Sequence, residues 1–433
     1  MKNIRSNLAA WLTYLETLPS GLSNPNLISL ELIAAKLQLG SLSSKVITVA
    51  GTNGKGSCVA FLEAILRAAN LQVATFTSPH LFCFNERIRI NGINVDDATL
   101  CRAFTTIEKI RGNTSLSYFE FTTLAALLIF QQTSLQVIVL EVGLGGRFDP
   151  VNIIDADIAV ISSIGFDHTH ILGNTRNAIG WEKAGIMRSH RPIIYGDNNP
   201  PLSVIAQAAC LQAPFYSVEK DFSYAQHSRS WNWSYLNKKT MQDLPLPRLP
   251  IENATTALMV IELLQEYYLI PDASIYQGIR EAFLPGRMQS ATLNTGSKVI
   301  FDVAHNPQAA KFLAKNISLL REQGRVLAVS SMLGDKDIVG TFSNLSAIID
   351  CWYIAALPSQ RGATLAQLEA SLKQSEVRQV NSFPDITMAL QQAIADCRKL
   401  DTIIVFGSFH TVGICMKYFS SSIRKEYQDV CAE

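Results

Sequence analysis

Short runs of apolar residues alternate with helix-like stretches along most of the chain. The runs that predict strands are 46–50, 137–140, 158–161, 192–195, 299–301, 326–329 and 402–406. Several of them are apolar throughout and end at Gly, Ser, Asp or Glu. Strands of a parallel sheet that is covered on both faces have this pattern, with polar chemistry at the strand ends. The sequence therefore predicts an α/β fold.

The predicted strands fall into two series, one at about 40–200 and one at about 298–410. Between the series lie a polar and aromatic stretch at 216–235, which suggests a short antiparallel excursion, and a helix at about 253–268. Pro-Gly and Asn-Thr-Gly-Ser sequences interrupt the chain within 285–297, as they do at domain boundaries. We expect a central-sheet domain at 1–290 and a smaller, Rossmann-like α/β domain at 291–433.

A glycine-rich loop between a predicted strand and a predicted helix is the motif with the most specific chemistry. Its residues are Gly51, Thr52, Asn53, Gly54, Lys55, Gly56 and Ser57. Glycines let backbone N–H groups converge on phosphate oxygens, and the following helix adds the positive end of its dipole. In such a P-loop, Lys55 would bridge the outer phosphates of ATP and Ser57 would bind Mg²⁺. Gly56 separates Lys55 from Ser57, which departs from the usual kinase and GTPase form; a plain glycine-rich turn is the alternative.

Acidic and histidine residues follow several predicted strands, where an α/β sheet binds its ligands. Glu141 ends the run 137–140 and is suited to holding Mg²⁺ on nucleotide phosphates, with a turn cap as the alternative. Taken alone, His168 reads as a structural residue, because His is an unusual magnesium ligand. Beside the loop and Glu141, the ligand role is favoured. Asp302 and His305 fit ribose or phosphate contacts, again with a turn cap as the alternative.

Composition narrows the class of protein. The chain has 433 residues and a formal net charge of +1, so no field-driven attraction to nucleic acid or membrane is expected. Eight cysteines include no CxxC pair, which disfavours a zinc ribbon and fits reduced thiols. The N-terminus predicts an amphipathic helix and not a signal peptide, and no apolar run approaches the ~20 residues that cross a bilayer. We expect a soluble, cytoplasmic monomer.

Taken together, these motifs resemble the folylpolyglutamate synthase family, part of the Mur ligase superfamily. The matching segments are 51–57, 77–81, 85–88, 118–122, 141–147, 167–168, 182–186, 253–254, 284–287, 301–307 and 407–410. The resemblance implies an N-terminal P-loop ATPase domain and a C-terminal glutamate ligase domain. It also implies ATP-dependent joining of a carboxylate to glutamate through an acyl phosphate.

The resemblance assigns roles to individual positions. Two Mg²⁺ ions would be held by Ser57, Ser78, Glu141, His168 and a carbamylated Lys183, although Ser78 alone reads as a cap and Lys183 alone as a surface lysine. Further ATP contacts would be Asn253, Arg287 and Asp302, and glutamate contacts would be His305 and Ser408. The catalytic residues would be Lys55, His168, Lys183 and His305. K⁺ is a further candidate ion.

The family adds glutamate to dihydropteroate, to folates, or to both. Segments resembling the dihydropteroate-contacting parts of the bifunctional bacterial type contain Ser23, Asn24, Tyr118, Phe119, Glu120, Arg147, Phe148 and Asp149. Phe148 and Pro150 stand where Leu and a small residue are common. The alternatives are a folylpolyglutamate synthase alone, a Mur-type ligase acting on a nucleotide-sugar peptide, and a nucleotide-dependent binding module.

Overall fold

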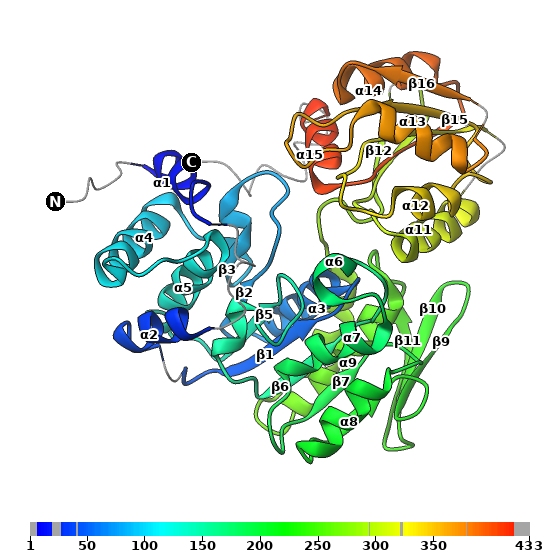
Figure 1. The fold of residues 1–433 in the computed structure, drawn as a ribbon. Helices are drawn as coiled ribbons and strands as arrows, with labels where there is room; N and C mark the ends of the chain where they lie inside the picture. The colour runs from blue at the N-terminus through cyan, green and yellow to red at the C-terminus, as the bar shows by residue number, and fades with distance from the viewer. Residues whose placement is uncertain are drawn as a thin grey trace. The chain divides into compact units, whose positions relative to one another are not determined.

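The computed structural model describes residues 7–19, 27–39, 42–293, 295–320, 324–377 and 379–419. The chain divides into two compact units (Figure 1). The first unit consists of the described residues up to His80 together with Phe84–Ile164 and Thr175–Phe283. The second consists of Leu81–Cys83, Gly165–Asn174 and the described residues from Leu284 onward. Two short segments from the N-terminal half thus belong to the second unit.

A mixed sheet is the centre of the first unit. Over the described residues it has eight strands, in the order β4-β3-β2-β5-β1-β6-β7-β8. Their bounds are β1 Lys45–Ala50, β2 Val73–Phe76, β3 Ile88–Ile90, β4 Ile93–Asn94, β5 Val137–Glu141, β6 Ile158–Ile161, β7 Ile193–Tyr195 and β8 Phe215–Ser217. The six strands from β2 to β8 in this order are parallel, whereas β3 and β4 form an antiparallel hairpin at one edge.

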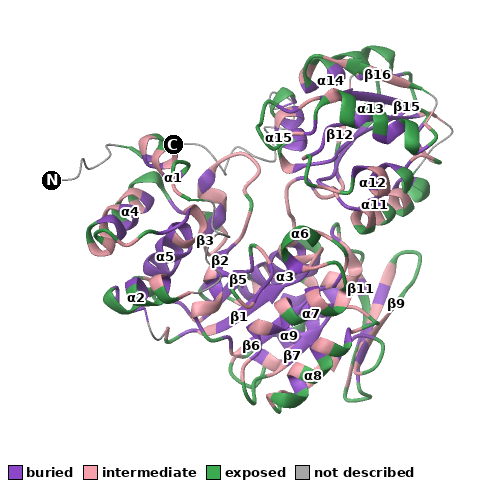
Figure 2. Ribbon diagram, viewed as in Figure 1, coloured by how far each residue is buried: buried purple, intermediate pink, exposed green. Residues whose placement is uncertain are grey.

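Helices cover this sheet, and the strands between them are buried (Figure 2). The helices of the first unit are α1 Leu8–Leu15, α2 Ile28–Lys36, α3 Lys55–Ala68, α4 Asp97–Arg111, α5 Tyr118–Gln131, α7 Arg176–Lys183, α8 Leu202–Cys210, α9 Ile251–Leu264 and α10 Asp272–Glu281, with short 3-10 helices at Phe84–Arg87, Pro150–Ile153 and Ala184–Ile186. α3 packs on β1, β2 and β5, and it contacts both α9 and α10. A Cβ at Gly278 would lie 2.5 Å from the Cα of Ile65, so the absence of a side chain lets α10 approach α3 closely.

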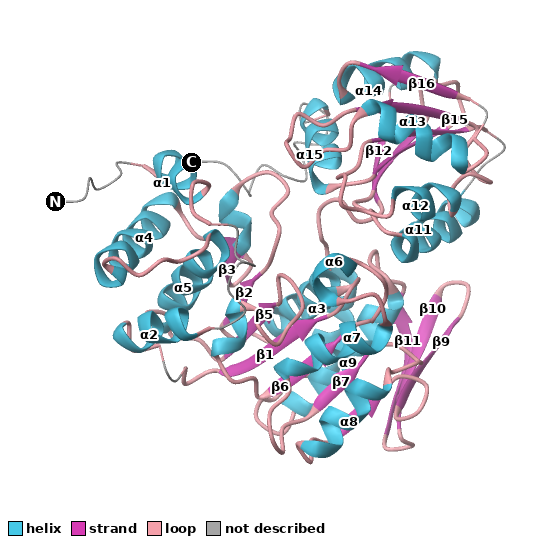
Figure 3. Ribbon diagram, in the orientation of Figure 1, coloured by secondary structure: helices cyan, strands magenta, loops and turns pink. Residues whose placement is uncertain are grey.

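A separate antiparallel sheet also belongs to the first unit (Figure 3). It consists of β9 Phe222–Gln226, β10 Ser230–Tyr235 and β11 Lys239–Pro245. Trp231, Trp233 and Tyr235 alternate with less buried residues along β10, so one face of this sheet is packed and the other is open. The antiparallel excursion predicted at 216–235 is therefore present, but it begins at Phe222 and continues to Pro245, because 215–217 joins the central sheet instead.

Over the residues that the structure describes, the second unit is an α/β layer structure around a six-stranded sheet in the order β12-β13-β17-β14-β15-β16. The strands are β12 Gln289–Thr292, β13 Lys298–Phe301, β14 Val326–Ser330, β15 Cys351–Ala355, β16 Val380–Phe383 and β17 Thr402–Phe406. The helices are α6 Thr169–Leu172, α11 Pro307–Leu320, α12 Ile338–Ser343, α13 Leu365–Gln374, α14 Ile386–Asp396 and α15 Phe409–Tyr418. Among these described strands, β12 pairs antiparallel with β13 and the other pairings are parallel. Val299 and Phe301 join one apolar cluster while Ile300 joins another, so both faces of the sheet are buried.

The predicted α/β class is confirmed, and every predicted strand is present to within two residues. The β3–β4 hairpin was not predicted, although Asn91 and Gly92, both at positive φ, form its turn. Among the described residues, no helix is both long and apolar enough to span a membrane. The domain limits of 1–290 and 291–433 remain a prediction.

Candidate active site

The phosphate loop lies where three parallel strands of the first unit end together. Val49 of β1 pairs with Glu141 of β5, and Ala50 pairs with Ile161 of β6. The chain leaves β1 for β2 on one side, while β6 lies on the other side of β1. Open α/β sheets bind their ligands at such a reversal of strand order. α3 begins at Lys55, so the N-terminus of a 14-residue helix is at the same place.

Two serines after β6 hold the loop in shape. The Thr52 N–H donates to the Ser163 carbonyl at 2.8 Å, and the Ser162 hydroxyl donates to the Asn53 carbonyl at 2.7 Å. The Ser163 hydroxyl reaches the same Asn53 carbonyl at 3.1 Å. The sequence alone did not single out Ser162 and Ser163. Both serines directly follow a buried strand at the sheet edge that carries the loop. This position was the feature of the sequence that could have identified them.

Two lysine ammonium groups meet at one carbonyl of the loop. Lys55 Nζ donates to the Gly51 oxygen at 3.0 Å and to the Thr52 oxygen at 3.4 Å. Lys183 Nζ, at the end of α7, donates to the same Gly51 oxygen at 3.0 Å. Lys183 is only 3% exposed, so the surface role considered from sequence alone is wrong. This arrangement concentrates positive charge beside the phosphate loop.

Oxygen donors suited to a hard divalent cation lie at the same strand ends. Glu141 is buried, and its carboxylate accepts the Ser78 N–H at 3.1 Å. Ser57 is buried in the first turn of α3, and the neighbouring Cys58 thiol has its pKa raised by burial and by the charge of Glu141. No group of three His, Cys, Asp or Glu side chains that could hold a metal occurs in the described part of the chain. One carboxylate with hydroxyls nevertheless fits Mg²⁺, which keeps waters and takes its remaining ligands from nucleotide phosphates.

Asn253 of α9 is brought against the loop from a distant part of the sequence. The Cys58 thiol lies 3.8 Å from the Asn253 carbonyl, across 195 residues of chain. A Cβ at Gly54 would fall 2.3 Å from Asn253 Oδ1. Gly54 also has a φ of +88°, in the left-handed region that glycine adopts without strain.

Gly54→Ala is expected to weaken ADP binding by at least about tenfold, because the new methyl group displaces Asn253 and strains the loop. The matched control is Gly112→Ala, where φ is +57° but nothing lies within 4 Å of the new Cβ. Isothermal titration calorimetry with ADP and MgCl₂ measures both variants. Unchanged affinity in Gly54→Ala would show that the close contact with Asn253 does not matter for the nucleotide.

The segment 118–120 starts α5 and is locally ordered by its own cap. Ser117 and Glu120 form a capping box, in which Glu120 accepts the Ser117 N–H at 2.7 Å. Phe119 packs on Phe76 at 5.8 Å between ring centroids, and a Cβ at Gly143 would lie 2.6 Å from its ring. The Arg87 guanidinium lies 5.6 Å from the centre of the Tyr118 ring. Glu120 therefore has a structural role, the Phe119 ring packs where β2 and β5 end, and the Tyr118 ring packs beside Arg87.

Arg147, Phe148 and Asp149 lie in three different environments. The Arg147 guanidinium lies 3.9 Å from the ring centre of Trp181, and Phe148 is 44% exposed. Asp149 is buried and accepts the N–H groups of Leu144 and Val151 at 2.9 and 3.0 Å. Burial raises the pKa of Asp149 to about 6, although these hydrogen bonds act in the opposite direction. Asp149 thus holds the loop together, while Arg147 and Phe148 form its outer surface.

In the second unit, Asp302 organises the end of β13. Its carboxylate accepts the N–H groups of Met288 and Ala304 at 3.0 and 2.9 Å. Burial raises the pKa of Asp302, against the opposing charge of Arg287. The Arg287 guanidinium lies 5.0 Å from the ring centre of Phe409. Ser408 caps α15, because its hydroxyl accepts the Thr411 N–H at 3.0 Å.

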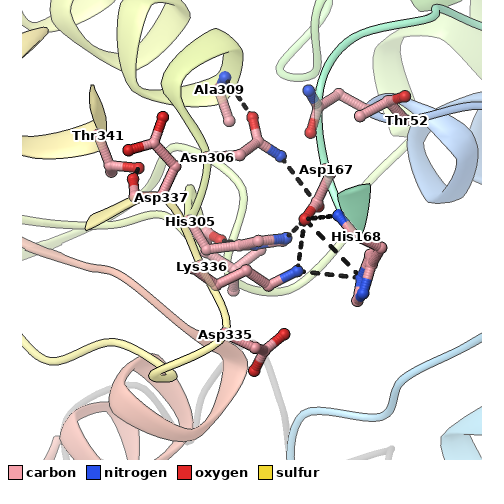
Figure 4. Close-up of polar contacts among 12 residues, drawn as sticks. Thr52, Asp167, His168, His305, Asn306, Ala309, Asp335, Lys336, Asp337 and Thr341 are labelled. Atoms are coloured by element: carbon pink, nitrogen blue, oxygen red, sulfur yellow. Dashed lines mark hydrogen bonds and ion pairs between the residues drawn. The ribbon is translucent and has the colours of Figure 1, made fainter. Parts of the chain in front are cut away.

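A second cluster in this unit is centred on the Asp167 carboxylate (Figure 4). Its Oδ1 accepts Lys336 Nζ at 2.7 Å and the backbone N–H of His168 at 2.8 Å. Its Oδ2 lies 3.4 Å from both His305 Nε2 and Asn306 Nδ2. Lys336 Nζ is also 3.0 Å from His168 Nε2. Sequence reasoning did not identify Lys336, because it is 169 residues from Asp167.

Charge and burial set the protonation states in this cluster. Burial acts to raise the pKa of the Asp167 carboxyl, but the hydrogen bond from His305 and the charge of Lys336 outweigh it and hold the pKa well below its usual value. Burial, aided by the Lys336 charge, lowers the pKa of His168 to about 4. Asp167 is therefore ionised and His168 neutral at physiological pH.

The candidate site residues thus form two groups, one in each unit. The first group holds the loop 51–57 with Ser78, Glu141, Lys183 and Asn253, and the second holds Asp167, His168, Arg287, Asp302, His305 and Ser408. Ser23 and Asn24 lie outside the described residues.

Comparison with known proteins identifies this arrangement. Residues 49–260 match the Mur ligase middle domain, and residues 286–409 match the Mur ligase glutamate ligase domain. The dihydrofolate synthase/folylpolyglutamate synthase of Escherichia coli K12 is 43% identical over 415 residues, covering 95% of each chain. The E. coli FolC structure in complex with DHPP and ADP aligns with a TM-score of 0.91 and 41% identity, over 98% of this chain and 100% of that one.

A bifunctional folylpolyglutamate synthase/dihydrofolate synthase structure with Mn, AMPPNP and L-glutamate bound aligns with a TM-score of 0.90 and 42% identity, over 96% and 99% of the two chains. The fold and the phosphate-loop site therefore define a Mur-type ligase, an enzyme class that uses ATP to form amide bonds. Within that class, the chain belongs to the dihydrofolate synthase/folylpolyglutamate synthase family. It is an ATP-dependent glutamate ligase.

Proposed function

We propose that this chain adds L-glutamate both to dihydropteroate, giving dihydrofolate, and to folates, giving polyglutamates. The observation that carries the proposal is the convergence of the loop 51–57, Glu141 and Lys183 at one edge of the sheet. We assign nucleotide binding to a domain at 1–290 and glutamate ligation to a domain at 291–433. The small-molecule partners of the chain would be dihydropteroate, folates, glutamate and ATP.

The reaction requires an activated acid, because a free carboxylate resists attack by an amine. A substrate carboxylate oxygen attacks the γ-phosphorus of ATP, the bond to the bridging oxygen breaks, and ADP leaves. The glutamate amine then attacks the carbonyl carbon of the acyl phosphate. Phosphate departs, the amine loses a proton, and an amide remains. The loop N–H groups and Lys55 offset the charge that spreads over the transferred phosphoryl group.

We assign the remaining nucleotide contacts to Asn253, Arg287 and Asp302. Ser57, Ser78, Glu141, His168 and Lys183 would hold two Mg²⁺ ions, with Lys183 carbamylated, and K⁺ is a further candidate. Bound magnesium would neutralise phosphate charge and raise the electrophilicity of the γ-phosphorus. The buried amine of Lys183, 3.0 Å from the Gly51 carbonyl, is already beside the phosphate loop. A carbamate there would supply an anionic oxygen ligand.

We assign the acid substrate to the surface formed by Tyr118, Phe119, Arg147 and Phe148, with Glu120 and Asp149 holding its two segments in shape. The exposed ring of Phe148 and the guanidinium of Arg147 are suited to a flat aromatic acid. Ser23 and Asn24 are proposed to contact the same substrate. His305 and Ser408 are proposed for the amino-acid substrate. A monomer in the cytoplasm is the proposed setting.

Incubating the protein with MgATP, glutamate and either dihydropteroate or tetrahydrofolate tests the proposal. Mass spectrometry is expected to find a product heavier by one glutamyl residue with each acid. Product from tetrahydrofolate alone would reduce the function to folylpolyglutamate synthesis. ADP release that is independent of both acids would favour a nucleotide-dependent binding module instead.

A further inference from the structure

In the second unit, a buried lysine side chain contacts the side chains of both Asp167 and His168. The side chain of Lys336 is only 4% exposed, although it follows β14 in a loop. Its ammonium donates to Asp167 Oδ1 at 2.7 Å and lies 3.0 Å from His168 Nε2 (Figure 4). Burying a lysine is costly unless its charge is paired, and here the Asp167 carboxylate supplies the pair. The surroundings of Lys336 Nζ therefore stabilise a positive charge.

The contact with His168 fixes the tautomer of the imidazole. An ammonium has three donors and no acceptor, so a 3.0 Å contact requires an unprotonated Nε2 that accepts the hydrogen bond. The single proton of the neutral ring is then on Nδ1. The only lone pair of the ring that is available to a cation is already shared with Lys336. While this contact persists, neither ring nitrogen of His168 can bind a metal ion.

We propose that Lys336 is an internal cation that competes with a divalent metal for His168, so that metal binding at this histidine requires Lys336 to leave Nε2. The inference rests on the proposed role of His168 as a metal ligand. A metal at Nε2 would replace the ammonium directly. A metal at Nδ1 would move the ring proton to Nε2 and remove the acceptor. Both routes break the same hydrogen bond.

The other contacts of Asp167 can remain in place when Lys336 leaves His168 Nε2. Asp167 keeps the backbone N–H of His168 on Oδ1, and His305 and Asn306 remain near Oδ2. His305 Nδ1 also lies 2.8 Å from the Val303 carbonyl oxygen, and this contact holds the ring in place. Lys336 can therefore release His168 while it stays paired with Asp167.

Removing the ammonium should strengthen metal binding. In Lys336→Met, Mn²⁺ is expected to bind at least about tenfold more tightly in the absence of nucleotide, because the ammonium that occupies His168 Nε2 is lost. Lys336→Arg keeps the charge and should bind like the parent chain, and Lys315→Met removes an exposed lysine of the same unit as a control. Electron paramagnetic resonance of free Mn²⁺ measures all three. Equal or weaker binding by Lys336→Met overturns the proposal.

A double-mutant cycle tests whether the effect of Lys336→Met on the affinity for Mn²⁺ depends on His168. In a His168→Ala background, Lys336→Met should no longer change the affinity for Mn²⁺. A change that persists without the histidine overturns the proposed competition. The measurement needs neither folate nor glutamate, so failure of the ligase assay and failure of this inference are separate results.

A measurement on the unaltered chain covers the case in which Lys336→Met does not fold. Nitrogen-15 NMR of labelled histidines, with the His168 signals identified by their loss in His168→Gln, reports which ring nitrogen carries the proton. Without added metal, the Nδ1–H tautomer is expected, and the Nε2 signal should move when Mg²⁺ is added. An Nε2–H tautomer without added metal contradicts the inference.

Discussion

Lys55→Ala is expected to reduce glutamate-dependent ADP release at least about a thousandfold, because no other side chain in the loop 51–57 carries a positive charge. Lys55 Nζ lies within 3.0 Å of the Gly51 carbonyl and 3.4 Å of the Thr52 carbonyl, so its ammonium is held beside the phosphate-binding backbone. Phosphoryl transfer spreads negative charge over the γ-phosphate oxygens. A positioned ammonium stabilises that charge more in the transition state than in bound ATP. A coupled assay of ADP with and without glutamate measures the loss.

The fold should survive this change, because Lys55 is in the first turn of α3 and does not join the apolar core. Circular dichroism and thermal unfolding check this point. Lys220→Ala, at an exposed lysine of the same unit, is the matched control and should retain full activity. Near-normal turnover by Lys55→Ala would refute the P-loop assignment.

Lys183→Ala is expected to lower the rate of ligation by about a hundredfold, and short carboxylates should restore part of it. In the proposed carbamylation, the Lys183 amine forms an N–C bond to carbon dioxide and releases a proton. This change gives an anionic oxygen beside the Gly51 carbonyl, 3.0 Å from the present Nζ. Alanine removes the side chain and leaves a space that acetate or formate can enter. Recovery of about tenfold with added acetate is the expected result, measured as folate product formed.

Two controls separate this rescue from general salt effects. The same concentration of chloride should restore nothing, and acetate should not change the activity of Lys220→Ala. Depleting bicarbonate should slow the unaltered enzyme but not Lys183→Ala. Full activity of Lys183→Ala without any added carboxylate would show that carbamylation is unnecessary here.

Local sequence was enough to predict the strands, because their burial dictates their composition. Val137–Glu141 is apolar until its last residue, as expected for a strand covered on both faces and ending at a polar edge. The β3–β4 hairpin escaped notice because each strand is only two or three residues long. Its Asn91-Gly92 turn was the stronger signal.

The site likewise has parts that local sequence predicts and parts that depend on tertiary packing. The loop 51–57 was predictable because one contiguous segment contains the glycines, the lysine and the hydroxyl that the chemistry needs. Asn253 was placed by family resemblance, but its contact with Gly54 depends on how α9 packs against α3. Ser162 and Ser163 became interpretable only once β6 was seen to lie beside β1.

The sequence by itself determined the elements, the phosphate loop and the supply of ligand-type residues at the strand ends, because burial and backbone freedom act over neighbouring residues. Only the tertiary structure decided the strand order, the pairing of Val49 with Glu141, and the transfer of Gly165–Asn174 to the second unit. It also placed Lys336 between Asp167 and His168. Such contacts depend on the packing of whole elements, and no spacing along the chain encodes them.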